Sequence, residues 1–93
     1  MKDFNTLKED YFKTLDFYMP VVERVHGPHH AEIYDVAKVY EAMKDHLEQN
    51  RSLEGDFKKL RNLTDNYRVP EDVCESYEAI YQMLSELDRT YTS

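Results

Sequence analysis

Apolar residues recur every three or four positions along most of this 93-residue chain. This spacing places them on one side of an α-helix. The clearest run lies near the beginning and consists of Phe4, Leu7, Tyr11, Leu15, Tyr18, Val22 and Val25. Since only 2 glycines and 3 prolines are available to interrupt such runs, the sequence predicts an all-α protein.

Local signals bound the first helix, which we expect over Asn5–His26. Thr6 and Glu9 have the spacing of a capping box at its beginning. Gly27 followed by Pro28 is typical of a helix end, because glycine tolerates a left-handed cap and proline cannot continue the helix. The sequence therefore predicts a tight corner directly after the first helix.

The remaining helices are less sharply bounded. The second is expected to begin within Pro28–His30, and the last at Pro70, a favoured first-turn residue. Between them, EQNRSLEGD (48–56) leaves two options open: Asn50 ends one helix and Ser52 starts another, or one helix continues over 30–66. Either way the connections are short, which predicts an antiparallel bundle of three to four helices in a single domain, residues 1–93.

Charge and cysteine content exclude several classes. A net charge of −7 disfavours nucleic acid and anionic membrane surfaces as partners. No apolar segment approaches the length of a membrane span, and Met1 to Asp3 do not open a signal peptide. Cys74 is the only cysteine, so no intrachain disulfide forms. We expect a cytoplasmic protein in which Cys74 packs, partly buried, against its neighbours.

Two ordered motifs carry a family resemblance. Residues 25–33, VHGPHHAEI, are similar to the VHGxxHPEL corner of hemerythrin-like iron-sulfur cluster repair proteins of the RIC type. Residues 60–67, LRNLTDNY, followed by Pro70 and Cys74, resemble the IRxLTxxY and PxdAC segments of that family. The resemblance implies a four-helix bundle holding two iron ions through histidine and glutamate side chains from all four helices.

Most of the implied iron ligands have no counterpart here. The resemblance places the first-helix histidine near Asn5, and the third-helix histidine at or near Asn50, since the segment between the helices is shortened. Asn50 also stands where a glutamate should follow His46 by four residues. The last histidine and glutamate would come after Leu87, where the chain reads DRTYTS. Only His46 and His26 stand at ligand positions.

The candidate metal ligands are therefore His46, His26 and His30, of which the last belongs to the clustered corner. Clustered imidazoles can bind a metal. The structural alternative is that His26 caps carbonyls at the end of the first helix and that His46 is packed and hydrogen-bonded. Lys58, Lys59 and Arg61 indicate a solvated helix face. No nucleophile–base pair or phosphate loop is present, so no enzyme activity is predicted.

We interpret the chain as a non-enzymatic helical scaffold or interaction protein that retains a hemerythrin-like, RIC-type fold without a cofactor. A homodimer is expected, and another protein is a further candidate partner. If one helix runs through 48–56, two chains can exchange halves to complete the bundle. The alternative function is an iron-binding protein in iron-sulfur cluster repair or in the response to nitric oxide or oxidative stress. In that case His46 and a partner chain's His26 or His30 would share the metal.

Overall fold

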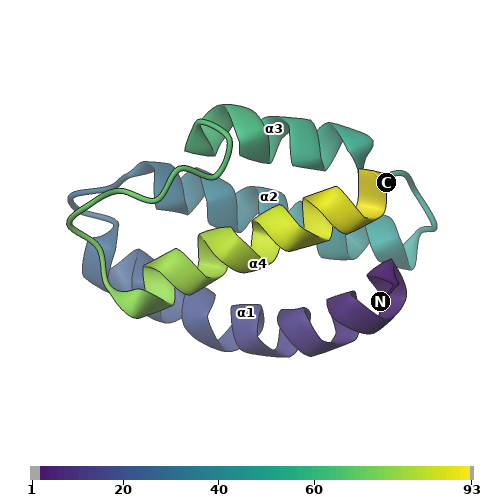
Figure 1. Cartoon of the computed structure of the whole chain (residues 1–93), viewed down its shortest axis with the longest axis horizontal. Helices are drawn as coiled ribbons and strands as arrows, with labels where there is room; N and C mark the ends of the chain where they lie inside the picture. The colour runs from purple at the N-terminus through teal and green to yellow at the C-terminus, as the bar shows by residue number, and fades with distance from the viewer. Residues whose placement is uncertain (1–2, 93) are drawn as a thin grey trace.

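The computed structural model describes residues 3–92, which form four α-helices and no β-strand within that range. The helices are α1 (Phe4–His26), α2 (Glu32–Glu48), α3 (Glu54–Thr64) and α4 (Glu75–Thr92). Consecutive helices run in opposite directions, and α1 packs against both α2 and α4 (Figure 1). The prediction of an all-α antiparallel bundle is confirmed. Within the described range, no helix combines the length and the apolar character that crossing a bilayer requires.

The N-terminus of α1 is capped by Asp3 and not by the predicted pair of Thr6 and Glu9. The Asp3 Oδ1 atom accepts a hydrogen bond of 2.9 Å from the Thr6 amide. Because this bond favours the ionised carboxylate, the pKa of Asp3 is lowered. Aspartate satisfies a free amide at a helix start as threonine would, so an acceptor three residues earlier replaces the expected capping box.

The corner after α1 ends the helix at His26, as predicted. The reason differs from the expected one, because Gly27 has right-handed backbone angles (φ −51°, ψ −42°). The side chain of Tyr34 lies over this glycine, and a Cβ atom built on Gly27 would come within 2.2 Å of the tyrosine ring. Glycine is thus needed here for close packing. Helix α2 then begins at Glu32, slightly later than predicted.

Of the two options left open for residues 48–56, the continuous helix over 30–66 is wrong and the break between two helices is correct. Helix α2 ends at Glu48, and Asn50 adopts a left-handed φ of 56°, which turns the chain back. Asparagine adopts this conformation more readily than most residues. Because α2 and α3 pack on each other within one chain, the structure gives no support to an exchange of halves between two chains.

Two hydrogen bonds fix the start of α3. The Ser52 hydroxyl accepts a bond of 3.1 Å from the Glu54 amide, which matches the option that Ser52 starts a new helix. The amide of Leu53, a fully buried residue, donates to the Tyr91 hydroxyl at 2.9 Å. The turn between α2 and α3 is thereby attached to the last turn of α4.

The last helix begins at Glu75 and not at Pro70, which lies in the connection after α3. Three consecutive residues there, Asp65, Asn66 and Tyr67, have φ values between 52° and 64°. This conformation is strained for tyrosine. Tyr67 is held in it because its amide donates to the Thr64 hydroxyl at 2.7 Å and its own hydroxyl is bound by α4.

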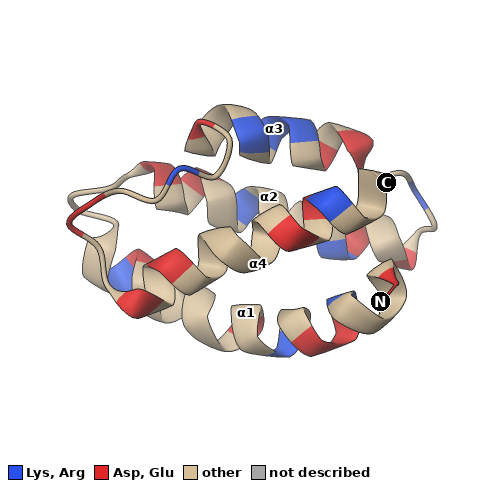
Figure 2. Ribbon diagram, viewed as in Figure 1, with Lys and Arg blue, Asp and Glu red and all other residues tan. Residues whose placement is uncertain are grey.

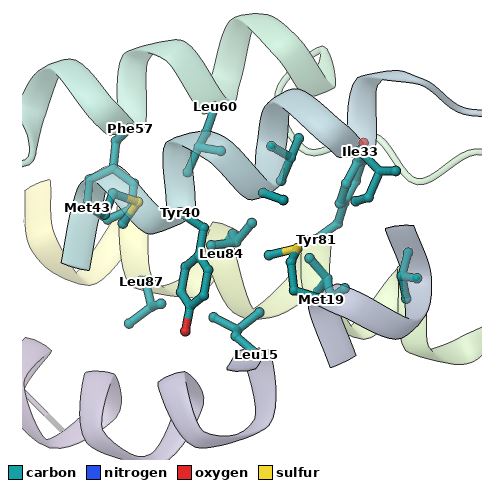
Figure 3. Close-up of a cluster of buried hydrophobic side chains, with 14 of the residues drawn as sticks. Leu15, Met19, Ile33, Tyr40, Met43, Phe57, Leu60, Tyr81, Leu84 and Leu87 are labelled. Atoms are coloured by element: carbon teal, nitrogen blue, oxygen red, sulfur yellow. The ribbon is translucent and has the colours of Figure 1, made fainter. Parts of the chain in front are cut away.

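The core lies between the four helices and contains aromatic side chains from several of them (Figure 3). Tyr40, Phe57, Tyr77 and Tyr81 are all almost completely buried. A buried tyrosine hydroxyl needs a hydrogen-bond partner. Tyr40 accordingly donates to the Asp16 carboxylate at 2.7 Å and to the Phe12 carbonyl at 3.2 Å. The core therefore carries polar groups that depend on specific partners.

Candidate functional site

The predicted histidine corner is packed around a tyrosine of α4. His26 is the last residue of α1, and His30 lies in the turn before α2. The Tyr77 ring meets both imidazoles edge to face, with ring centroids 5.5 Å from His26 and 5.7 Å from His30. The two histidine rings lie 6.4 Å apart. The structure therefore brings His26 and His30 together, as the sequence pattern suggested.

Two carboxylates occupy the nitrogens of His30. Its Nε2 atom lies 3.0 Å from Asp72 in the connection before α4, and its Nδ1 atom lies 3.4 Å from Glu32. The His30 side chain is only 15% exposed. An imidazole with a carboxylate at each nitrogen is held by the protein on both sides. His30 therefore joins the start of α2 to the connection before α4.

The Tyr77 hydroxyl continues this network into the core. It donates to Glu32 at 3.1 Å and lies 3.1 Å from the Tyr81 hydroxyl. Burial raises the pKa of Tyr77, and the hydrogen bond with Tyr81 and the charge of Glu32 raise it further. Burial also raises the pKa of Tyr81. Both hydroxyls therefore stay protonated and act as hydrogen-bonding groups.

His26 differs from its neighbours in one respect. Its Nε2 atom is buried and has no hydrogen-bond partner among the described residues. Burying an unpaired polar atom costs stability. This nitrogen does not bind a helix carbonyl, so it gives no support to the alternative that His26 caps the end of α1. The helix end is satisfied instead by the turn, since the His26 carbonyl accepts from the amides of His29 and His30 at 3.0 and 2.8 Å.

The third candidate, His46, lies at the other end of the bundle. It belongs to the last turn of α2, whereas His26 ends the antiparallel α1. Its Nδ1 atom is 2.7 Å from the Oδ2 atom of Asp56, a residue of α3 that is only 4% exposed. His46 is thus hydrogen-bonded at the edge of the core. This matches the alternative to a metal ligand, namely a packed and hydrogen-bonded histidine.

These positions decide whether the residues fit a metal centre. Within residues 3–92, no three His, Cys, Asp or Glu side chains are placed so that they could hold one ion. A carboxylate-bridged di-iron centre needs several histidines and bridging carboxylates around one point. His26 and His46 lie at opposite ends of the bundle, and His46 and His30 are bound by carboxylates of other helices or turns. The donor set of one chain does not fit such a centre.

A second buried acid was missed in the sequence. Asp88 on α4 is 4% exposed and accepts two bonds from Arg61 of α3, at 2.8 and 2.9 Å. The Tyr67 hydroxyl donates to the same carboxylate at 2.8 Å. Burial and the Asp88 hydrogen bond raise the pKa of Tyr67. Arg61 therefore pairs with Asp88 across the two helices. Its side chain is 37% exposed, so the prediction of a solvated face is correct only in part for this residue.

Both buried acids left a signal in the sequence. Asp56 lies between Leu53 and Leu60 in the apolar spacing of α3, and Asp88 follows Leu84 by four residues on α4. An acid at such a position must find a partner when the helix packs.

The prediction that Cys74 is partly buried is wrong, because its side chain is exposed.

Comparison with known proteins gives two curated relatives, both named iron-sulfur cluster repair protein ScdA, from two strains of Staphylococcus epidermidis. Each is 27% identical over 121 residues, which cover 90% of this chain and 53% of the relative. The chain thus spans about half the length of the curated relatives it matches. No family model matches the chain, and no solved structure matches it significantly.

The chain and its relatives also differ in length within the matched region. The aligned stretch of 121 residues is longer than the 93-residue chain, so the relatives have residues in this region that the chain lacks. In this region the chain is therefore shorter than the two relatives to which it is similar.

Proposed function

We propose that this chain serves iron-sulfur cluster repair as a cytoplasmic helical module that acts by binding another protein, and that it is not an enzyme. The similarity to the two staphylococcal repair proteins supports the process. The placement of the histidines supports the other part of the proposal, that the chain binds another protein and is not an enzyme. The two at positions where the resemblance implies ligands, His26 and His46, lie at opposite ends of one bundle.

The interaction of His46 with Asp56 gives that histidine a role without a metal. A buried carboxylate 2.7 Å from the imidazole nitrogen joins α2 to α3 at the end of the bundle. Packing and polar pairing of this kind keep a helical scaffold in one conformation. A rigid bundle presents its outer helix faces at fixed positions, which favours recognition by a protein partner.

Metal content measured together with molar mass tests the proposal. We would purify the protein without an affinity tag and apply elemental analysis and light scattering to the same sample. The expected result is metal far below one equivalent per chain. Iron or zinc near one equivalent, retained after dialysis against a chelator, would contradict it. A homodimer stays a prediction, and the molar mass tests it.

The proposed role in iron-sulfur cluster repair can be tested in cells by following how fast a damaged iron-sulfur enzyme regains its activity. Cells lacking the gene are expected to regain the activity of an iron-sulfur dehydratase more slowly after exposure to nitric oxide or peroxide. The double variant His26→Phe, His46→Gln should restore recovery, since the proposal assigns neither imidazole to a metal. Equal recovery with and without the gene would remove the proposed process.

One observation favours a second candidate function, a metal-binding protein in the same process or in the response to nitric oxide or oxidative stress. The buried Nε2 atom of His26 has no partner among the described residues, and imidazole nitrogen is a common metal ligand. Two chains would have to supply the remaining ligands, with His26 or His30 of one chain and His46 of the other. In that case His26→Phe removes bound metal, and His46→Ala removes it together with the dimer.

A further inference from the structure

Helix α1 carries a row of exposed apolar side chains that the core does not use. Phe17, Val21 and Val25 are 71%, 37% and 58% exposed, and they follow one another at intervals of four residues. We call them the α1 stripe. Four-residue spacing puts them on one side of the helix over two turns. Single exposed apolar residues are ordinary, whereas a row of three large ones marks a surface that contacts something.

The stripe is distinct from the side of α1 that faces the bundle. The residues of α1 that enter the core include Leu15, Met19 and Val22, all at most 3% exposed. Branched residues such as valine form helices less readily than alanine, lysine or glutamate, so helix formation does not explain Val21 and Val25 on the surface. The α1 stripe is a second apolar edge on a helix whose inner side is already packed.

Two cations lie beside the α1 stripe. Lys13 precedes Phe17 by four residues and Arg24 follows Val21 by three, so both fall on the same side of α1. Both are exposed, and neither pairs with a carboxylate in the part of the chain that the structure describes. The nearest acid along this side, Asp10, precedes Lys13 by three residues and lies two turns before Phe17. The chain as a whole has a net charge of −7, and acidic residues occur on all four helices (Figure 2).

The two cations discriminate between possible occupants. In a symmetric antiparallel pair of α1 helices, each side of one helix meets the same side of the other. The Lys13 and Arg24 edges of two copies would then face each other, and like charges across an interface are unfavourable. A partner with acidic residues along its edge gains two ion pairs from the same contact. The charges therefore favour a different protein over a second copy.

We infer that the α1 stripe is the docking surface for an amphipathic helix of another protein, with apolar residues three or four apart and carboxylates along the edge that meets Lys13 and Arg24. Such a helix inserts its apolar side chains against Phe17, Val21 and Val25. The inference rests on the proposed function as a protein-binding module and gives the chemistry of the partner. Phe17 is the expected anchor, because a large aromatic side chain buries most area on binding.

Two synthetic amphipathic peptides of about five turns test the inference. They share one leucine face and differ only in whether glutamate or lysine borders it. Fluorescence anisotropy with the full chain should show the glutamate-bordered peptide binding at least about tenfold more tightly. The double variant Phe17→Ser, Val21→Ser should weaken that binding by at least about tenfold. Since both residues are exposed, its thermal unfolding monitored by circular dichroism should match the wild type.

Charge reversal provides the matched control. Lys13→Glu with Arg24→Glu should reverse the preference toward the lysine-bordered peptide. Lys58→Glu with Lys59→Glu makes the same change of charge on an exposed part of α3 and should leave the preference unchanged. Loss of preference in both variants would mean that net charge, and not the α1 stripe, selects the peptide, which contradicts the inference.

Three other outcomes would overturn it. Neither peptide binding, or both binding equally, removes the assigned partner chemistry. A dimer in light scattering that Phe17→Ser dissociates assigns the stripe to a second copy. Sedimentation with vesicles containing anionic lipid, abolished by the same variant, assigns it to a membrane surface. None of these outcomes alters the metal content or the cellular recovery that test the proposed function, so the two proposals fail separately.

Discussion

The Nδ1 atom of His46 lies 2.7 Å from the Oδ2 atom of Asp56 and joins the last turn of α2 to the first turn of α3. Asp56 is almost completely buried, whereas about a third of the His46 side chain is exposed. The carboxylate also lies in the first turn of α3, where the helix dipole favours negative charge. The imidazole is thus the side-chain partner of a buried acid at the point where the chain reverses.

Removing that imidazole should destabilise the bundle. His46→Ala leaves the buried Asp56 carboxylate without its side-chain partner, and we expect the free energy of unfolding to fall by about 2 kcal/mol. Urea denaturation followed by circular dichroism measures this. Asp56→Asn should cost less, because the amide can still pair with His46. A cycle with His46→Ala, Asp56→Ala and the double variant tests the coupling. If the double variant lost the sum of these two single effects, the two residues would not be coupled.

The two glycines should respond oppositely to alanine. A methyl group on Gly27 would lie 2.2 Å from the Tyr34 ring and 2.4 Å from the Glu23 carbonyl oxygen, so something must move. We expect Gly27→Ala to lower the free energy of unfolding by about 1–3 kcal/mol.

Gly55 is the matched control. It lies in the first turn of α3, and nothing lies within 4 Å of an added methyl group. Because alanine loses less backbone freedom on folding than glycine, Gly55→Ala should raise the free energy of unfolding by about 0.4–1 kcal/mol. Equal effects of Gly27→Ala and Gly55→Ala in thermal denaturation would contradict the close packing at the corner.

The Asp88 network should depend more on arginine than on tyrosine. Arg61→Met removes two bonds from a buried carboxylate and is expected to cost about 3 kcal/mol of unfolding free energy. Tyr67→Phe removes one bond and is expected to cost about 1 kcal/mol. Lys59→Met, a neutralisation at an exposed position of α3, should stay within about 0.5 kcal/mol of the wild type. The ranking fails if Lys59→Met is as destabilising as Arg61→Met.

The ion pair between Asp16 of α1 and Lys44 of α2, at 2.8 Å, should make stability depend on pH. Burial raises the pKa of Asp16, but hydrogen bonds from Lys44 and Tyr40 outweigh this effect. The resulting pKa lies below the ordinary value of 3.8. A lowered native pKa contributes stability that is complete above the unfolded value and is lost as the pH falls through the native one.

The lysine has the opposite sign. Burial lowers the pKa of Lys44, but hydrogen bonds to Asp16 and Glu41 outweigh it, so that the pKa lies above 10.5. This contribution is present at neutral pH and is lost as the pH rises through the native value. Lys44→Met should therefore cost about 0.5 kcal/mol at neutral pH and almost nothing near pH 2. Lys38→Met, at an exposed position of the same helix, should show no such difference between the two pH values in urea denaturation.

Several positions show why part of the site could not be predicted. The expected end of the first helix at His26 was correct, because Pro28 cannot continue a helix. The role of Gly27 was not predicted, because it depends on packing against Tyr34 of α2. The last helix was predicted to begin at Pro70, whereas it begins at Glu75. Proline is favoured in the first turn of a helix, but it is also common in connections between helices. Asp56 and Asp88 interrupt apolar spacing, yet which residue pairs with each depends on another helix.

The amino-acid sequence by itself determined the helical class, the end of α1 and the net charge, because these depend on spacing along one helix, on local backbone chemistry or on composition. It also placed His26 and His30 at one corner. Only the tertiary structure decided that α2 and α3 separate at Asn50, that His46 pairs with Asp56, and that Arg61 reaches Asp88. Those outcomes depend on contacts between residues distant in sequence, whose free energies outweigh local helix preference.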